Sequence, residues 1–201
     1  MMKDWKKLPA YKAEPRIDSL VGYYLASILS ENLRVEIKGI IPEFPLRLGT
    51  LKPEHEGTNY SDRSYKVDFF AVGNNGKNYL IEFKTDTGSR RDGQDLYLQE
   101  AKGFGTRAIV DGVIKISNVS TYVKKYDHLK DKMQELGILD AQFNYSGENP
   151  VLEIIYVQPS NKTMGSNVIT FDDIANWLDS NPQRDSFEIA FIDALRTWSK
   201  D

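Results

Sequence analysis

The chain has 201 residues, of which 40% are hydrophobic and 11% aromatic, enough for one domain with a hydrophobic core. Because it has no cysteine, a disulfide framework, a thiol nucleophile and a cysteine metal site are excluded, and any metal ion would be held mainly by oxygen. The net charge of −3 argues against coating nucleic acid by bulk electrostatics but allows a local basic groove. We find no apolar signal segment and no run of about 20 apolar residues, and therefore expect a cytoplasmic protein.

A helix is predicted over residues 16–33, RIDSLVGYYLASILSENL, because apolar side chains repeat at helical spacing from Ile17 to Leu29. The face that carries Leu20 and Tyr24 reaches Glu31, which would place a carboxylate at the end of the inward stripe. The alternative is a solvated acid in the last turn of the helix.

Three extended segments follow the helix. Residues 34–49 alternate apolar and polar positions and contain two prolines, which indicates an edge or interrupted strand. Residues 51–64 are rich in turn formers and predict a loop. Residues 65–72 and 77–84 predict two strands joined around the sequence GNNG.

The middle of the chain alternates helical and extended patterns. Residues 94–105 look helical, and the apolar positions in 106–116 fit either a helix or a strand. Residues 122–139 form an amphipathic pattern whose helix is expected to end near Gly137. The nearly continuous apolar run of 151–159, VLEIIYVQP, is typical of a strand covered on both faces.

Two helices are predicted in the C-terminal part, over 170–179 and 184–199. Thr170 is the expected N-cap of the first, with Asp173 three places on. The second has a broad apolar face, for which we weigh core packing against a subunit contact between two copies. That face consists of Phe187, Ile189, Ala190, Phe191, Ala194, Leu195 and Trp198.

The hairpin contains charged residues in an otherwise apolar setting. Glu82 and Lys84 are two residues apart and therefore point to the same face of a strand. A two-residue loop would put Asp68 and Glu82 on opposite faces, whereas a three-residue loop over 74–76 sets them directly across from each other. Gly76 favours the longer loop, because its third position takes a left-handed backbone that glycine adopts without strain.

Two carboxylates facing each other across a hairpin repel, so a positive charge must offset them. Lys84 is one candidate, and a divalent cation is the other, since Mg²⁺ prefers carboxylate oxygens and retains several waters. An ion and an ammonium beside each other suit the hydrolysis of a phosphodiester.

Asp68, a spacer of thirteen residues that contains the turn, and then Glu82-Phe83-Lys84 resemble the active-site signature of the PD-(D/E)XK nuclease superfamily. Val67 stands where that family often has proline. The resemblance implies an α/β fold with a restriction-endonuclease-like core, a central mixed β-sheet flanked by helices in the order αβββαβ. That core would span about residues 17–158 of a single domain (1–201), with extra C-terminal helices over about 168–199.

The resemblance also implies a function and a set of site residues. The protein would be a metal-dependent nuclease that hydrolyses DNA phosphodiesters with Mg²⁺ or Mn²⁺. Asp68 and Glu82 would hold the metal together with the backbone carbonyl of Phe83, and Lys84 would assist catalysis. Glu31 matches the acid that the family often carries on the preceding helix, and Gln94 matches a polar residue on the following one.

The acid-x-lysine motif alone is not specific, because the chain also contains Asp4-Trp5-Lys6 and Glu36-Ile37-Lys38. Only Glu82 has a partner acid predicted across a hairpin. Substrate phosphates would meet four cations on the rim of the site: Arg90, Arg91, Lys102 and Arg107. Acidic residues are interleaved among these cations in the sequence.

Two further interpretations compete with a nuclease. Asp68, Glu82 and Lys84 would form a structural ion network on an exposed sheet face, or the chain would be a catalytically inactive binding or assembly module with the same fold. A homodimer, formed through the last helix, is a further expectation.

Overall fold

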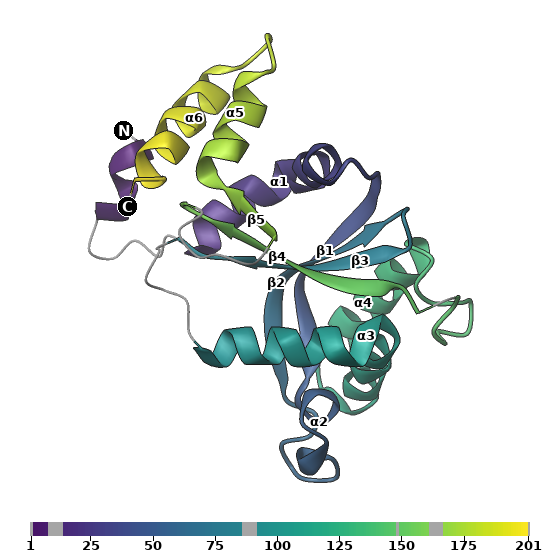
Figure 1. Cartoon of the computed structure of the whole chain (residues 1–201). Coiled ribbons are helices and arrows are strands. Elements are labelled where there is room, and N and C mark those ends of the chain that lie inside the picture. Colours follow the sequence, from purple (N-terminus) through teal and green to yellow (C-terminus); the bar gives the residue numbers. More distant parts are fainter. Residues whose placement is uncertain (1, 8–13, 86–91, 148, 161–166, 201) are drawn as a thin grey trace. The chain divides into compact units, whose positions relative to one another are not determined.

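A computed structural model describes residues 2–7, 14–85, 92–147, 149–160 and 167–200 (Figure 1). The chain divides into two compact units, and two of the boundaries between them fall within the strands β3 and β4. Unit 1 comprises Met1–Arg34, Ile81–Arg91 and Ile155–Asp201, and unit 2 comprises Val35–Leu80 and Asp92–Ile154. The elements are η1 (Met2–Lys7), α1 (Glu14–Leu33), β1 (Ile37–Arg47), α2 (Leu48–Leu51), η2 (Pro53–His55), β2 (Ser64–Gly73), β3 (Lys77–Phe83), α3 (Asp92–Val119), α4 (Val123–Glu135), β4 (Val151–Gln158), β5 (Asn167–Thr170), α5 (Phe171–Asp179) and α6 (Ser186–Trp198).

The strands form one five-stranded sheet in the order β1-β2-β3-β4-β5. The sheet is mixed, because β1 pairs antiparallel with β2 and β4 pairs parallel with β5. The predicted α/β class with a mixed sheet flanked by helices is therefore confirmed. No helix in the described part of the chain is long and apolar enough to cross a membrane.

In unit 2, β1 is an edge strand, as its two prolines predict. Its pairing with β2 is irregular between Ile37 and Gly39, and the rings of Phe44 and Phe70 stack with centroids 4.6 Å apart. Three residues, 74–76, separate β2 from β3, and Gly76 has a φ of 71°. The predicted loop length and the left-handed glycine are both confirmed.

The structure of unit 2 decides whether residues 106–116 form a helix or a strand. Residues 106–116 are helical and belong to α3, which kinks at Gly105, where φ is 80°. Helix α4 ends at Glu135, and Gly137 follows with a φ of 72°, a common way for a helix to end. The segment predicted as a loop over 51–64 contains the short turns of η2 and the end of α2.

In unit 1, α6 packs against α5 and η1, and the indole nitrogen of Trp198 donates a hydrogen bond to the Lys3 carbonyl at 3.1 Å. The predicted N-cap is confirmed, since Thr170 and Asp173 form a reciprocal capping box. The apolar face of α6 is narrower than predicted, because Phe187, Ile189 and Ala190 are exposed.

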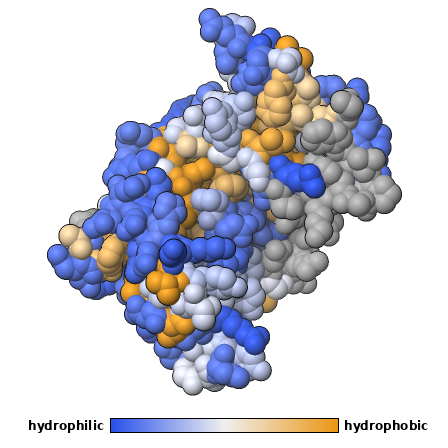
Figure 2. Space-filling model, turned by 180° about the vertical axis from the view of Figure 1, so that it is seen from behind, coloured by the Kyte–Doolittle hydropathy of each residue, from blue (hydrophilic) through white to orange (hydrophobic). Residues whose placement is uncertain are grey.

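The space-filling view shows mostly hydrophilic residues on the face it presents, with separate apolar areas between them (Figure 2). Large apolar side chains that remain exposed include Tyr23, Leu96, Val119, Tyr122 and Ile189. Scattered exposure of this kind is ordinary for a folded protein.

Candidate functional site

The end of β3 carries the charged pair that the sequence singles out. Strand alternation sends Ile81 and Phe83 to one face and Glu82 and Lys84 to the other. Phe83 is fully buried, and its ring lies 6.5 Å from that of Phe171, the first residue of α5. The apolar face therefore anchors the strand end and fixes the direction in which the two charged side chains point.

Glu82 and Lys84 form an ion pair with each other. Lys84 Nζ donates a hydrogen bond to Glu82 Oε1 at 2.7 Å, and the residues are only 1% and 3% exposed. Of the alternative of a structural ion network on an exposed sheet face, only the exposure is wrong, because both side chains are buried and do form an ion pair.

The backbone around Lys84 is also held in place. Its amide nitrogen donates to the Val157 carbonyl at 2.8 Å, so the ladder between β3 and β4 extends one residue beyond the strand. The next carbonyl, of Thr85, accepts a hydrogen bond from Lys6 Nζ at 2.8 Å. A rigid backbone and a buried partner together restrict the positions that the Lys84 ammonium can take.

Burying two opposite charges costs several kcal/mol of desolvation per ion, so a pair of this kind is weak evidence for stability. Breaking the pair, in contrast, removes the hydrogen-bonded ion pair of a buried charge, which is strongly destabilising. A sheet interior is normally apolar, and a buried ion pair there needs a further reason. Function is one such reason.

Asp68 lies on β2 in unit 2 and is half-buried. Glu82 and Lys84 belong to unit 1, so the pairing of Asp68 with Glu82 across the hairpin stays a prediction. The observed loop of three residues is the length on which that predicted register depends.

Glu31 is exposed in the last turn of α1, in agreement with the alternative of a solvated acid. It lines a hollow of about 300 Å³ with residues of α5 and α6, and neither Glu82 nor Lys84 lines it. In the same hollow, Tyr24 donates to Glu188 at 3.2 Å, and burial together with that carboxylate raises the pKa of Tyr24 to about 12.

The buried acid of α1 is Asp18, which sequence reasoning missed. Asp18 is 9% exposed, whereas Val21, Leu25 and Ile28 are fully buried. Steps of three and four residues from Asp18 lead through these three positions, so they lie on one stripe of the helix. This spacing in the sequence could have identified Asp18 as the acid on the buried stripe. Asp18 lies in the N-terminal half of the helix, whereas Glu31 lies at its C-terminal end.

The remaining predicted residues lie in several settings. Arg90 and Arg91 are outside the described residues, as is the side chain of Gln94, whose backbone belongs to α3. Lys102 is exposed and pairs with Glu153 at 2.8 Å.

Arg107, also exposed, has its guanidinium carbon 5.9 Å from the centre of the Tyr145 ring. Both described cations of the predicted rim therefore have intramolecular contacts, and the charge of Lys102 is partly neutralised by the carboxylate of Glu153.

A magnesium ion suits the chemistry of the donors at the end of β3. The carboxylate of Glu82 and the backbone carbonyl of Phe83 are hard oxygen donors of the kind that Mg²⁺ prefers. Within the described ranges, no group of three or more His, Cys, Asp or Glu side chains that could hold a metal ion is found.

Comparison with known proteins adds no further constraint. No family model matches the chain, and neither the curated proteins nor the solved structures give a significant match.

Proposed function

We propose that the protein is a metal-dependent nuclease that hydrolyses DNA phosphodiester bonds with Mg²⁺ or Mn²⁺. The observation that carries this proposal is the buried ion pair between Glu82 and Lys84 at 2.7 Å, two residues apart at the end of a sheet strand. The order of elements from α1 to β4 and the three-residue hairpin loop support a restriction-endonuclease-like core.

Each residue has a distinct task in the proposed site. Asp68, Glu82 and the Phe83 carbonyl would hold the metal ion. When bound, that ion lowers the pKa of a coordinated water and neutralises charge on the phosphate. The Lys84 ammonium donates a hydrogen bond to a phosphate oxygen and stabilises the negative charge that develops there.

Glu82 also acts on Lys84, because the hydrogen bond between them orients the ammonium. Asp18 replaces Glu31 as the candidate acid of the preceding helix, since Asp18 is buried and Glu31 is exposed.

The test is cleavage of DNA in the presence and absence of Mg²⁺ or Mn²⁺. Glu82→Gln, Asp68→Asn and Lys84→Met should each lower the rate roughly 100-fold or more, because each removes a group that stabilises the transition state. The chain offers a matched control in Glu36-Ile37-Lys38, where Lys38 is exposed. Lys38→Met removes the lysine of the same short motif and should leave cleavage unchanged.

Circular dichroism must show that each variant is folded. Full activity in a folded Lys84→Met variant contradicts the role assigned to Lys84, and cleavage that persists without a divalent cation contradicts the proposal as a whole.

A second candidate is a binding or assembly module that has the same fold and no activity. The ion pair between Lys102 and Glu153 favours it, because it weakens the basic rim that a DNA substrate would need. Calorimetry with Mg²⁺ or Mn²⁺ separates the two candidates. Heat of binding that disappears in Asp68→Asn supports the enzyme, and no heat with the wild-type protein supports the module.

A further inference from the structure

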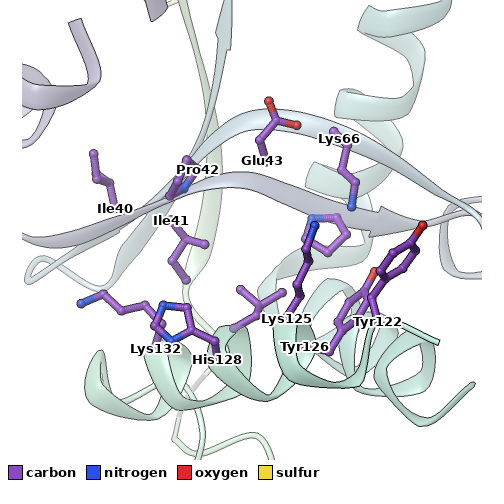
Figure 3. A pocket seen from close by; sticks show the side chains of 12 residues that line it. Ile40, Ile41, Pro42, Glu43, Lys66, Tyr122, Lys125, Tyr126, His128 and Lys132 are labelled. Atoms are coloured by element: carbon purple, nitrogen blue, oxygen red, sulfur yellow. The ribbon is translucent and has the colours of Figure 1, made fainter. Parts of the chain in front are cut away.

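A hollow of about 640 Å³ lies in unit 2 between helix α4 and the strands β1 and β2 (Figure 3). The strand wall contributes Glu43 and apolar residues of β1 together with Lys66 of β2, and the helix wall contributes Lys125, His128 and Lys132. None of the residues that line it belongs to the predicted catalytic set. Its volume lies in the range of roughly 300 to 1,000 Å³ that is usual for small-molecule sites.

Two lysines from opposite walls point into this hollow. Lys66 reaches from the strands toward the helix, and Lys125 reaches from the helix toward the strands (Figure 3). Among the residues that the structure describes, neither forms an ion pair, whereas Lys132 pairs with Glu135 at 2.9 Å. The carboxylate of Glu43 points away from α4 (Figure 3).

The two cations are therefore only weakly compensated by the protein. Desolvation lowers the pKa of Lys66, and the charge of Glu43 opposes this shift without overcoming it. An anion placed between the two ammonium groups would be attracted to both of them. Phosphate, with up to two negative charges, is well matched to a pair of lysines.

The rest of the lining suits a flat ring. Tyr122, the N-cap residue of α4, and Tyr126 of α4 stand beside the lysines, and Lys125 Nζ lies 5.4 Å from the centre of the Tyr122 ring (Figure 3). Tyr122 is 66% exposed, so its ring is available for stacking by a ligand. Burial raises the pKa of Tyr126, so its hydroxyl stays neutral and adds no negative charge.

We propose that this hollow binds a nucleoside phosphate, with the phosphate between Lys66 and Lys125 and the base against the tyrosine rings. A base stacked on an aromatic side chain beside cations that hold the phosphate is a common arrangement in nucleotide recognition. The ligand is either a free mononucleotide or one nucleotide of a single strand, which share this chemistry. The site does not depend on the proposed nuclease activity.

The test is isothermal titration calorimetry of the full chain without divalent cations, with adenosine 5′-monophosphate as the probe. Adenosine and inorganic phosphate each lack one half of the recognised group and should bind at least ten-fold more weakly. Lys66→Met and Lys125→Met should each weaken binding of the monophosphate roughly ten-fold or more, because each removes a charged hydrogen-bond donor. Tyr122→Leu should weaken the monophosphate and leave inorganic phosphate unchanged.

Lys124 provides the matched control, because it lies next to Lys125 on α4, is exposed and does not line the hollow. Lys124→Met should bind the monophosphate as the wild type does. Equal loss in Lys124→Met and Lys125→Met would mean nonspecific attraction by a basic helix and would overturn the site. Equal affinity for inorganic phosphate and the monophosphate, or no heat with the monophosphate at millimolar concentration, would also overturn the site. So would tighter binding of decanoate, an anion with an aliphatic chain in place of a base, than of the monophosphate.

A single-stranded tetranucleotide separates the two sources of the ligand. Tighter binding than the monophosphate, lost in Lys66→Met, assigns the site to a nucleic-acid strand, and weaker binding assigns it to a free nucleotide. Glu82→Gln should abolish cleavage and keep monophosphate binding, so failure of the nuclease proposal and failure of this one give different results.

Discussion

Lysines occur in two contrasting settings in this protein. Lys84 is buried at the end of β3 and has the carboxylate of Glu82 at 2.7 Å. Lys66 and Lys125 line an open hollow, and no carboxylate pairs with either of them in the described part of the chain. The charge of Lys84 is compensated by a carboxylate of the protein, whereas the charges of Lys66 and Lys125 remain available to a ligand.

The contrast shows how the cost of charge depends on burial. A buried ammonium needs a fixed counter-ion, because the interior solvates charge poorly. A cation in an open hollow can be solvated by water until an anion replaces the water. Removing a charge should therefore cause a large loss of stability at the first place and a small gain at the second.

The largest effect is expected for Glu82→Gln. The substitution removes the carboxylate that accepts from Lys84 and leaves the ammonium in a buried position, so the free energy of unfolding should fall by about 3–5 kcal/mol. Urea unfolding at pH 7, followed by circular dichroism, measures the change.

Glu36→Gln is the comparison, because Glu36 is exposed and belongs to the other acid-x-lysine motif. Its effect should be within about 0.5 kcal/mol. The double variant Glu82→Leu/Lys84→Met removes both charges and should recover most of the lost stability. A loss below about 1 kcal/mol in Glu82→Gln would show that the pair is not the buried counter-ion arrangement described above.

Much of the fold was predictable where a local signal decides the structure. Gly76 selected the three-residue loop because only a residue that tolerates positive φ suits its last position, and its φ is indeed 71°. Thr170 and Asp173 indicated the start of α5 because a capping box is encoded within four residues. Such features require no knowledge of the rest of the chain.

Features that depend on distant residues were not predictable. β5 has only four residues, and its pairing with β4 is not encoded locally. Residues 106–116 fitted two periodicities, and the extension of α3 through Gly105 decided between them. The face of α6 was overestimated because its sequence does not show that α5 and η1 cover only part of it.

In the candidate site, too, the local features were predictable and those that depend on distant residues were not. Strand parity places Glu82 and Lys84 on one face, and they do form a pair, but their burial depends on what covers them. The hollow beside α4 was missed because its walls come from segments roughly 60 to 90 residues apart, and neither Lys66 nor Lys125 belongs to a motif.

A smaller effect is expected for Glu153→Gln, which tests the rim. The hydrogen bond from Lys102 lowers the pKa of Glu153, with a further contribution from Lys77. The pair is partly exposed, so the variant should lose only about 0.5 kcal/mol of unfolding free energy at pH 7. Because the folded-state pKa is lowered, this contribution is present above the ordinary carboxyl range and disappears as the pH falls through the folded-state value.

Urea unfolding of wild type and Glu153→Gln at several values between pH 7 and pH 3 measures that dependence. Glu54→Gln is the matched control, since Glu54 is exposed and forms no salt bridge with a described residue. Its free energy of unfolding should equal that of the wild type at each of these pH values. A gap between wild type and Glu153→Gln that persists unchanged at pH 3 would mean that the carboxylate charge is not its source. Removal of Glu153 also releases Lys102, so binding of DNA should strengthen if that lysine belongs to the rim.

The smallest effect is expected for Lys66→Met, and its sign is opposite to that of Glu82→Gln. Desolvation lowers the pKa of Lys66, so the folded protein binds this proton less tightly than the unfolded chain does. The charged ammonium therefore costs stability at neutral pH, and the cost disappears as the pH rises toward the ordinary lysine value of about 10.4. Lys66→Met should raise the free energy of unfolding at pH 7 by about 0.3 kcal/mol, within the usual range for a surface substitution, and the gain should vanish near pH 10.5. Thermal unfolding at pH 7 and pH 10.5, with Lys124→Met as the exposed control, measures both values. A clear loss of stability in Lys66→Met would indicate that this ammonium has a stabilising partner, and the hollow would then lack the open positive charge that makes it a site for an anion.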